Sequence, residues 1–155
     1  MTEATSSTKR PSTWTWFVVN IFYPLLPFFL EGIIRWITGG FIVHFNTFNG
    51  STLSISLGLL SLFVNQSLLT NERPLSDSAE IESLRATATF FSSFAVLCFA
   101  FFAVLVVLQA LVESSPSTDI KRIAEAFDAV VFVGWAVPVV AAVMAQRSFK
   151  LRTTL

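Results

Sequence analysis

Residues 86–112 read ATATFFSSFAVLCFAFFAVLVVLQALV, and this stretch contains no charged residue. A helix needs about 20 mostly apolar residues to cross a hydrocarbon core of about 30 Å, so the stretch is long enough to span a membrane. Backbone N–H and C=O groups left unpaired in lipid are very costly, and a helix pairs them within itself. We therefore predict a transmembrane helix here, in spite of the many Phe and Val residues.

Three other stretches have the same character, at about residues 14–37, 51–69 and 123–145. Of the 155 residues, 54% are apolar and only 13% are charged, which is too much apolar surface for a soluble domain of this length to bury. The sequence therefore predicts an all-α membrane protein with four transmembrane helices, in a transmembrane domain over residues 14–146.

The basic residues in the flanking segments predict the orientation, because Lys and Arg in short loops stay in the cytoplasm. Seven flank the two ends of the domain or the loop between the second and third helices, and two lie between the third and fourth. The seven are Lys9, Arg10, Arg73, Arg85, Arg147, Lys150 and Arg152, and the two are Lys121 and Arg122. We expect a bacterial inner-membrane protein with a disordered N-terminal segment (1–13) and a C-terminal tail (147–155), both in the cytoplasm.

The segment NERPLSDSAEIESLR, residues 71–85, is the one sizeable cytoplasmic element. Asp77 followed by Glu80 has the spacing of a capping box, which predicts that the third helix starts at Ser78 and continues to residue 112. Such a helix would project about 15–20 Å beyond the hydrocarbon. This extension, which also carries Glu82, is either a docking site for a cytoplasmic partner or a solvated entrance to the helix.

Small polar residues recur along the second helix. Ser54, Gly58 and Ser61 have the spacing i, i+4, i+7, and Asn65 follows one turn later. Small residues at this spacing let two membrane helices approach closely, and hydroxyl groups bond across the contact. The same chemistry would line a pore between copies of the chain, so both helix packing and pore lining remain open.

The first helix contains the most unusual polar cluster. Glu31 and Arg35 are four residues apart and can pair on one face of the helix. They form either a gate or ion path, or an ion pair near the outer interface with Arg35 reaching toward water. Pro24 and Pro27 each remove a helical hydrogen bond and predict bends, as Pro138 does in the fourth helix.

Catalysis is not expected. The chain has one cysteine, Cys98, and one histidine, His44, so it cannot assemble a usual zinc or haem site. No nucleophile–base pair and no glycine-rich phosphate loop is visible, and we predict no cofactor. Ten basic and ten acidic residues cancel, which leaves no field to attract nucleic acid.

The stretch Gly50-Ser51-Thr52-Leu53-Ser54, followed by Gly58, resembles the start of the second helix in the RexB-like four-helix proteins that phages carry to exclude other phages. The architecture is also similar to the small membrane subunit of Kiwa-type anti-phage defence systems. The resemblance implies a membrane sensor, or an ion-conducting effector that depolarises an infected cell, working with a cytoplasmic partner.

Three hypotheses follow for function. The first is a homo-oligomeric membrane protein of a bacterial defence or stress response, acting as a sensor with or without channel activity, with the second helix nearest the symmetry axis. The second is a non-conducting anchor or accessory subunit of a larger complex. The third is a small multidrug transporter, suggested by four helices and an acidic residue in the first.

Overall fold

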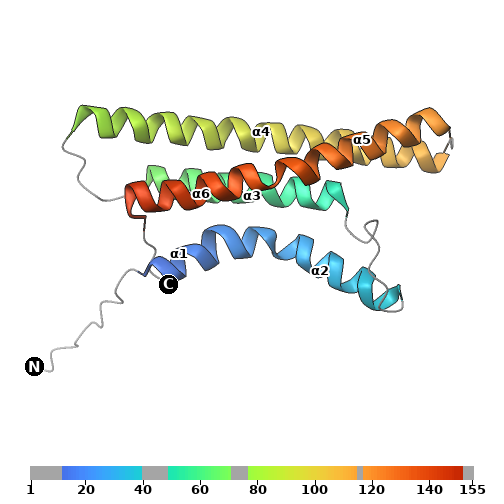
Figure 1. Ribbon diagram of the computed structural model, residues 1–155, viewed down its shortest axis with the longest axis horizontal. Helices are drawn as coiled ribbons and strands as arrows, with labels where there is room; N and C mark the ends of the chain where they lie inside the picture. Colours follow the sequence, from blue (N-terminus) through green and yellow to red (C-terminus); the bar gives the residue numbers. More distant parts are fainter. Residues whose placement is uncertain (1–11, 40–48, 71–76, 115–116, 152–155) are drawn as a thin grey trace, which may run out of the picture.

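The computed structural model describes residues 12–39, 49–70, 77–114 and 117–151, and every secondary-structure element in these ranges is a helix (Figure 1). The elements are α1 (Thr13–Phe17), the π-helix η1 (Val18–Phe22), α2 (Tyr23–Thr38), α3 (Gly50–Leu69), α4 (Ser78–Ser114), α5 (Thr118–Gly134) and α6 (Ala136–Phe149). Residues 1–11 of the predicted N-terminal segment, His44 and residues 71–76 lie outside these ranges.

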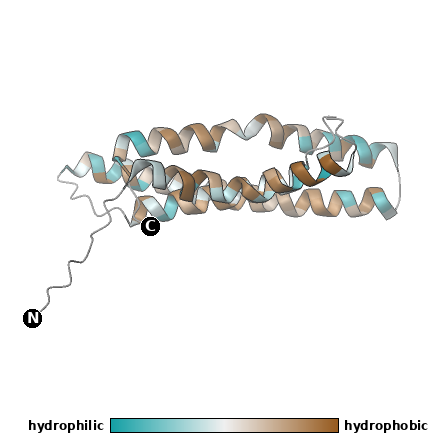
Figure 2. Ribbon diagram, turned by 90° about the horizontal axis from the view of Figure 1, so that it is seen from below, coloured by the Kyte–Doolittle hydropathy of each residue, from teal (hydrophilic) through white to brown (hydrophobic). Residues whose placement is uncertain are grey.

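The helices form four rods, each long and apolar enough to cross a membrane: Thr13–Thr38, Gly50–Leu69, Ser78–Ser114 and Thr118–Phe149. This confirms the predicted number and type of the spans. Figure 2 shows apolar residues along the rods and hydrophilic residues gathered toward their ends. The first three rods match the predicted boundaries within two residues, whereas the fourth starts five residues earlier and ends four residues later than predicted.

Side-chain caps define where three of the rods begin. Asn49 Oδ1 accepts from the N–H of Ser51 at 3.0 Å, and Asp77 Oδ1 accepts from the N–H of Ala79 at 3.1 Å. The fourth rod is capped by Ser117, whose Oγ accepts from the N–H of Asp119 at 3.3 Å. Each bond satisfies an N–H group that has no partner within the first helical turn. The fourth rod therefore starts in the polar segment before the apolar run. This explains why the prediction from hydropathy placed the start of this rod too late.

Helix α3 is the centre of the bundle. It contacts α2, η1, α4, α5 and α6. Half of its span is buried inside the molecule, compared with 17% for each of the other three rods. The buried half of α3 includes Ser54, Gly58 and Ser61, which pack against the chain's own helices, whereas Leu62, Phe63 and Leu69 lie on its exposed side.

The C-terminal end departs from the predicted tail over residues 147–155. Helix α6 continues to Phe149, and Lys150 adopts the left-handed conformation with φ 50° and ψ 43°. This turn brings the N–H of Leu151 within 3.3 Å of the Gln146 oxygen, in the 6→1 pattern of a Schellman motif. Leu151 is 1% exposed. Residues 147–151 therefore pack as part of the helical bundle.

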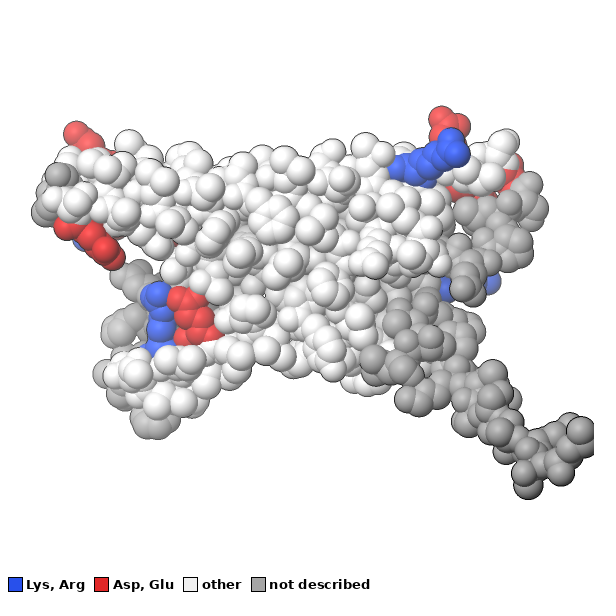
Figure 3. Space-filling model, turned by 180° about the vertical axis from the view of Figure 1, so that it is seen from behind, with Lys and Arg blue, Asp and Glu red and all other residues white. Residues whose placement is uncertain are grey.

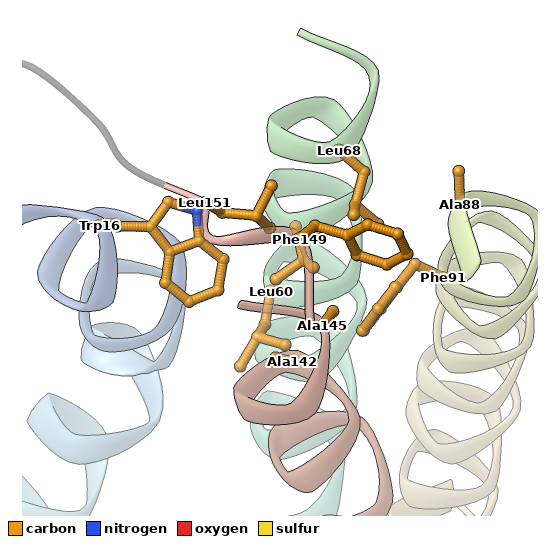
Figure 4. Close-up of a cluster of buried hydrophobic side chains, with 10 residues drawn as sticks. Trp16, Leu60, Leu68, Ala88, Phe91, Ala142, Ala145, Phe149 and Leu151 are labelled. Carbon is orange, nitrogen blue, oxygen red and sulfur yellow. The ribbon is translucent and has the colours of Figure 1, made fainter. Parts of the chain in front are cut away.

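Leu151 belongs to a cluster of buried side chains that joins all four rods at one end of the bundle (Figure 4). Trp16 comes from the first rod, Leu60 from the second, Phe91 from the third and Phe149 from the fourth. The indole N–H of Trp16 donates to Ser67 Oγ at 2.6 Å, which satisfies the polar atom of this fully buried side chain. This end is therefore fixed by packing, and it also contains both the first and the last described residues (Figure 1).

Candidate functional site

The polar face of α3 is turned toward α4. Ser54 is 1% exposed, and its hydroxyl donates to the carbonyl of Cys98 in α4 at 2.8 Å. One turn along, a Cβ added to Gly58 would lie 3.0 Å from Phe99 Cε1 and 3.3 Å from Cys98 Cβ. The absence of a side chain at Gly58 therefore allows the two helices to approach closely, which is the task expected of small residues in a membrane helix interface.

The other two polar positions of α3 differ in burial. Ser61 is completely buried, and its hydroxyl donates to the Leu57 carbonyl in its own helix at 2.8 Å. Asn65, one turn closer to the cluster around Trp16, is half-buried. Ser54 and Ser61 thus lie inside a single copy of the chain. Of the two alternatives left open by the sequence, their contacts are those of helix packing.

A polar cluster closes the opposite end of the bundle. Asn49 Oδ1, besides capping α3, accepts from Gln109 Nε2 in α4 at 2.9 Å and from Ser51 Oγ at 2.9 Å. One carbonyl oxygen thus satisfies donors from two helices. Nothing in the local sequence pattern around Gln109 pointed to Asn49, which is 60 residues away along the chain.

Asp128 of α5 packs against Gly50, the first residue of α3. A Cβ at Gly50 would overlap the Asp128 carboxylate and lie 3.3 Å from Asp128 Cα. The carboxylate faces the N-terminus of α3, where the helix dipole stabilises negative charge. Its Oδ1 atom is shielded and has no hydrogen-bond partner among the described residues. The structure thus brings Asp128 to the start of α3.

Glu31 and Arg35 form the predicted ion pair, with Arg35 Nη2 2.6 Å from Glu31 Oε1. The side chains are 24% and 44% exposed, respectively. Beyond Gly32, which is buried, residues 33–39 of this rod are all exposed, and α2 diverges from the other helices (Figure 1). Figure 3 shows a basic and an acidic side chain in contact at the hollow between the lower left arm and the rest of the bundle. Glu31 Oε2 is shielded without a hydrogen-bond partner among the described residues.

The three prolines act in different ways. Pro24 follows η1, in which the N–H of Tyr23 bonds to the Val18 carbonyl, five residues back. A π-turn of this kind widens the helix where Pro24 cannot donate to residue 20. Pro27 is accommodated inside α2 without a break. Pro138 lies in α6, just after the interruption at Trp135 that separates α5 from α6.

The predicted docking residues lie at the beginning of α4. Asp77 caps the helix, and Glu80 in the first turn and Glu82 are exposed. At about 1.5 Å per residue, the 37 residues of α4 make a helix of about 55 Å. This length exceeds a hydrocarbon core of about 30 Å and leaves the acidic first turns outside the apolar run.

Reactive groups do not converge among the residues that the structure describes. Cys98 is buried and not part of a disulfide. The described ranges hold no group of three or more His, Cys, Asp or Glu side chains that could bind a metal ion. The candidate site is consequently a set of packing and charge contacts: the α3–α4 face, the ion pair on α2 and the acidic start of α4.

Comparisons with known proteins identify no relative from which a role for these residues could be inferred. No protein-family model matches the chain, and no curated protein and no solved structure matches it significantly.

Proposed function

We propose that this chain is a non-conducting sensor or adaptor subunit in the inner membrane of a bacterium, with both termini in the cytoplasm. The observation that carries this proposal is the orientation of α3, whose polar face is turned into the bundle and closed by α4. The setting in anti-phage defence or stress comes from the resemblance of residues 50–58 to the RexB-like and Kiwa-type proteins.

A pore lined by α3 has less support than this assignment. In a symmetric oligomer, the pore-lining residues of each copy must lie on the surface that faces the axis. Ser54 and Ser61 are 1% and 0% exposed, and both hydroxyl groups already donate to backbone carbonyls of the chain. Opening such a pore would require α4 to separate from α3.

A proton-coupled multidrug transporter also has less support. Such a carrier needs an acidic side chain within the membrane that can exchange its proton for a cationic substrate. Glu31, the acidic residue of the first rod, is paired with Arg35 at 2.6 Å. The Arg35 guanidinium therefore already occupies this carboxylate and would compete with a cationic substrate for it.

The adaptor role is supported by the contrast between the lipid-facing surface of the rods and the first turns of α4. The lipid-facing surface is apolar, whereas the first turns of α4 carry exposed acidic groups, Glu80 and Glu82, beyond the apolar run. Charged groups that no fold contact requires are suited to bind a basic surface on a cytoplasmic protein. A change in the bundle can reach this surface directly, since α4 is one uninterrupted helix from Ser78 to Ser114.

Two measurements test the proposal. Liposomes containing the purified protein should show no more ion flux than empty liposomes under an applied potential. Flux that disappears in a folded Ser54→Leu/Ser61→Leu variant would instead establish an α3 pore and overturn the non-conducting assignment.

The second measurement is survival of phage-challenged cells that carry the gene with its genomic neighbours. Glu80→Lys/Glu82→Lys should abolish protection. The matched control is Glu113→Lys/Glu125→Lys, which makes the same charge change with exposed residues at the opposite end of the bundle and should retain protection. Equal protection from both variants would remove the start of α4 as the partner surface.

A further inference from the structure

A groove of about 210 Å³ lies between α4 and the junction of α5 with α6. Its walls are Phe94, Leu97 and Phe101 on one side and Val130, Gly134 and Val137 on the other. Leu97, Val130 and Val137 are 50%, 56% and 52% exposed, so the groove opens to the outside of the bundle. It is separate from the ion pair on α2 and from the acidic start of α4.

The sequence builds this groove at the interruption of the fourth rod. Pro138 cannot donate a hydrogen bond to the carbonyl of residue 134, and the helical hydrogen-bond pattern is interrupted at Trp135, whose backbone stays in the right-handed helical region. At the same point, a Cβ added to Gly134 would meet no atom within 4 Å. The missing side chain at Gly134 therefore leaves space that the chain itself does not fill.

The polar atoms nearest to the groove are already satisfied. Ser54 and Cys98 lie at its base, and the Ser54 hydroxyl donates to the Cys98 carbonyl at 2.8 Å. No hydroxyl donor is therefore left to orient a polar ligand, and the remaining lining is hydrocarbon and aromatic. An enclosed apolar cavity of about 150 Å³ is known to bind benzene, so an apolar space of this size is large enough to hold a small hydrocarbon group.

The depth of the groove indicates which apolar groups would be available to occupy it. Its α4 wall spans residues 94–101, which include residue 99, the midpoint of the uncharged stretch 86–112. In a chain that crosses the bilayer, this position lies in the middle of the hydrocarbon, where the available groups are the distal parts of lipid acyl chains. A helix about 10 Å wide is too large to enter the groove.

We propose that the groove binds the distal part of one acyl chain of a membrane lipid, beside the α5–α6 junction. Since lipid and groove are both apolar, the binding free energy comes from close packing in a space that would otherwise be empty, and not from transfer out of water. This binding site is independent of the proposed sensor role, because it requires only that the chain spans the membrane.

Tryptophan quenching by brominated lipid tests the site. The protein would carry Trp14→Phe and Trp36→Phe, which leaves Trp135 at the junction and Trp16, fully buried in the distant core cluster, as an internal reference. Delipidated protein is titrated with phosphatidylcholine brominated near the end of the acyl chain or near the headgroup. We expect saturable quenching of Trp135, stronger with the distal bromines, at a stoichiometry of one lipid per chain.

Two leucine substitutions in the same turn provide the matched comparison. Gly134→Leu fills the groove and should remove the saturable component, whereas Val133→Leu, at a position that is 82% exposed and does not line the groove, should retain it. Helix content and unquenched Trp16 emission report that each variant is folded. If quenching rises without saturation and equally in all three proteins, it comes only from lipid of the surrounding bilayer. That result would overturn the proposal.

A third outcome identifies a different occupant. If quenching is not saturable and Gly134→Leu dissociates an oligomer seen by sedimentation, a side chain of a second copy fills the groove, and the lipid proposal is wrong.

Discussion

At the scale of single residues, two glycines in membrane-spanning helices have opposite surroundings. Gly58 faces Phe99 and Cys98 so closely that a Cβ would meet both, whereas a Cβ at Gly134 would meet nothing within 4 Å. Gly58→Leu should therefore lower the free energy of unfolding by about 1–3 kcal/mol through overpacking. Gly134→Leu should leave it unchanged or raise it, because leucine favours the helix over glycine. Reversible unfolding in mixed micelles measures both values.

This comparison controls for the general effect of a larger side chain, since both substitutions are identical and both sites are helical. If Gly58→Leu and Gly134→Leu lower the free energy of unfolding equally, the loss at Gly58 does not come from close contact between α3 and α4.

Two serines of α3 allow a similar comparison of hydrogen bonds. The Ser54 hydroxyl bonds to a different helix, at Cys98, while the Ser61 hydroxyl bonds to Leu57 in its own helix. Interhelical hydrogen bonds in membrane proteins contribute on average about 0.6 kcal/mol and at most about 1.7 kcal/mol. We expect Ser54→Ala to destabilise by about this amount and Ser61→Ala by less. A larger loss for Ser61→Ala in the same unfolding measurement would contradict the assigned bonds.

At the scale of the element, the π-helix η1 follows from the position of Pro24. Pro24→Ala restores an N–H group and should return residues 18–22 to the α-helical register. Their amide hydrogen exchange should then slow relative to the natural sequence. Pro27→Ala, in a part of α2 that is already α-helical, is the control and should leave exchange of residues 18–22 unchanged.

The Trp16–Ser67 hydrogen bond gives this prediction a second observable. When the π-turn returns to the α-helical register, the turn contains one residue fewer. This change rotates Trp16 by about 100° relative to the residues after Pro24. The indole would leave Ser67, and its fluorescence should shift to longer wavelength. Unchanged exchange and emission would mean that the packing of Trp16, and not Pro24, maintains the π-turn.

The elements themselves were largely predictable from the sequence. Membrane length and the demand for internal hydrogen bonds leave few options for an uncharged apolar stretch, so the four rods and the first residue of α4 follow from local pattern. The start at Thr118 did not follow, because four of the five residues before the predicted start, 118–122, are polar. The packing of Leu151 did not follow either, since it depends on a left-handed Lys150 and on side chains from the other rods.

The candidate site was predictable only where its partners are close in sequence. Glu31 and Arg35 are one helical turn apart, and their pairing was expected from spacing. Asn49 with Gln109, and Gly50 with Asp128, join residues far apart in the chain. A single sequence contains no periodic signal for such pairs, because they result from how the helices pack.

At the scale of the whole molecule, the proposed orientation can be tested by chemical labelling. Asp119 and Ser148 are exposed residues at opposite ends of the fourth rod. In intact spheroplasts, a membrane-impermeant maleimide should label Asp119→Cys and not Ser148→Cys, and inverted vesicles should give the reverse. The natural Cys98 is buried and provides an unreactive background. Labelling of Ser148→Cys in spheroplasts would place both termini outside the cytoplasm.

The core cluster that contains Trp16 and Leu151 also has a consequence for how the protein is made. Trp16 emerges from the ribosome first, but its buried environment is completed by Phe149, at the end of the last rod, and by Leu151 just beyond it. The first rod must therefore remain in the bilayer with an incompletely packed indole ring until the last rod is synthesised and inserted. Closure of this end of the bundle is a late step of biogenesis, and a factor that shelters unpacked membrane helices would act on the first rod during that interval.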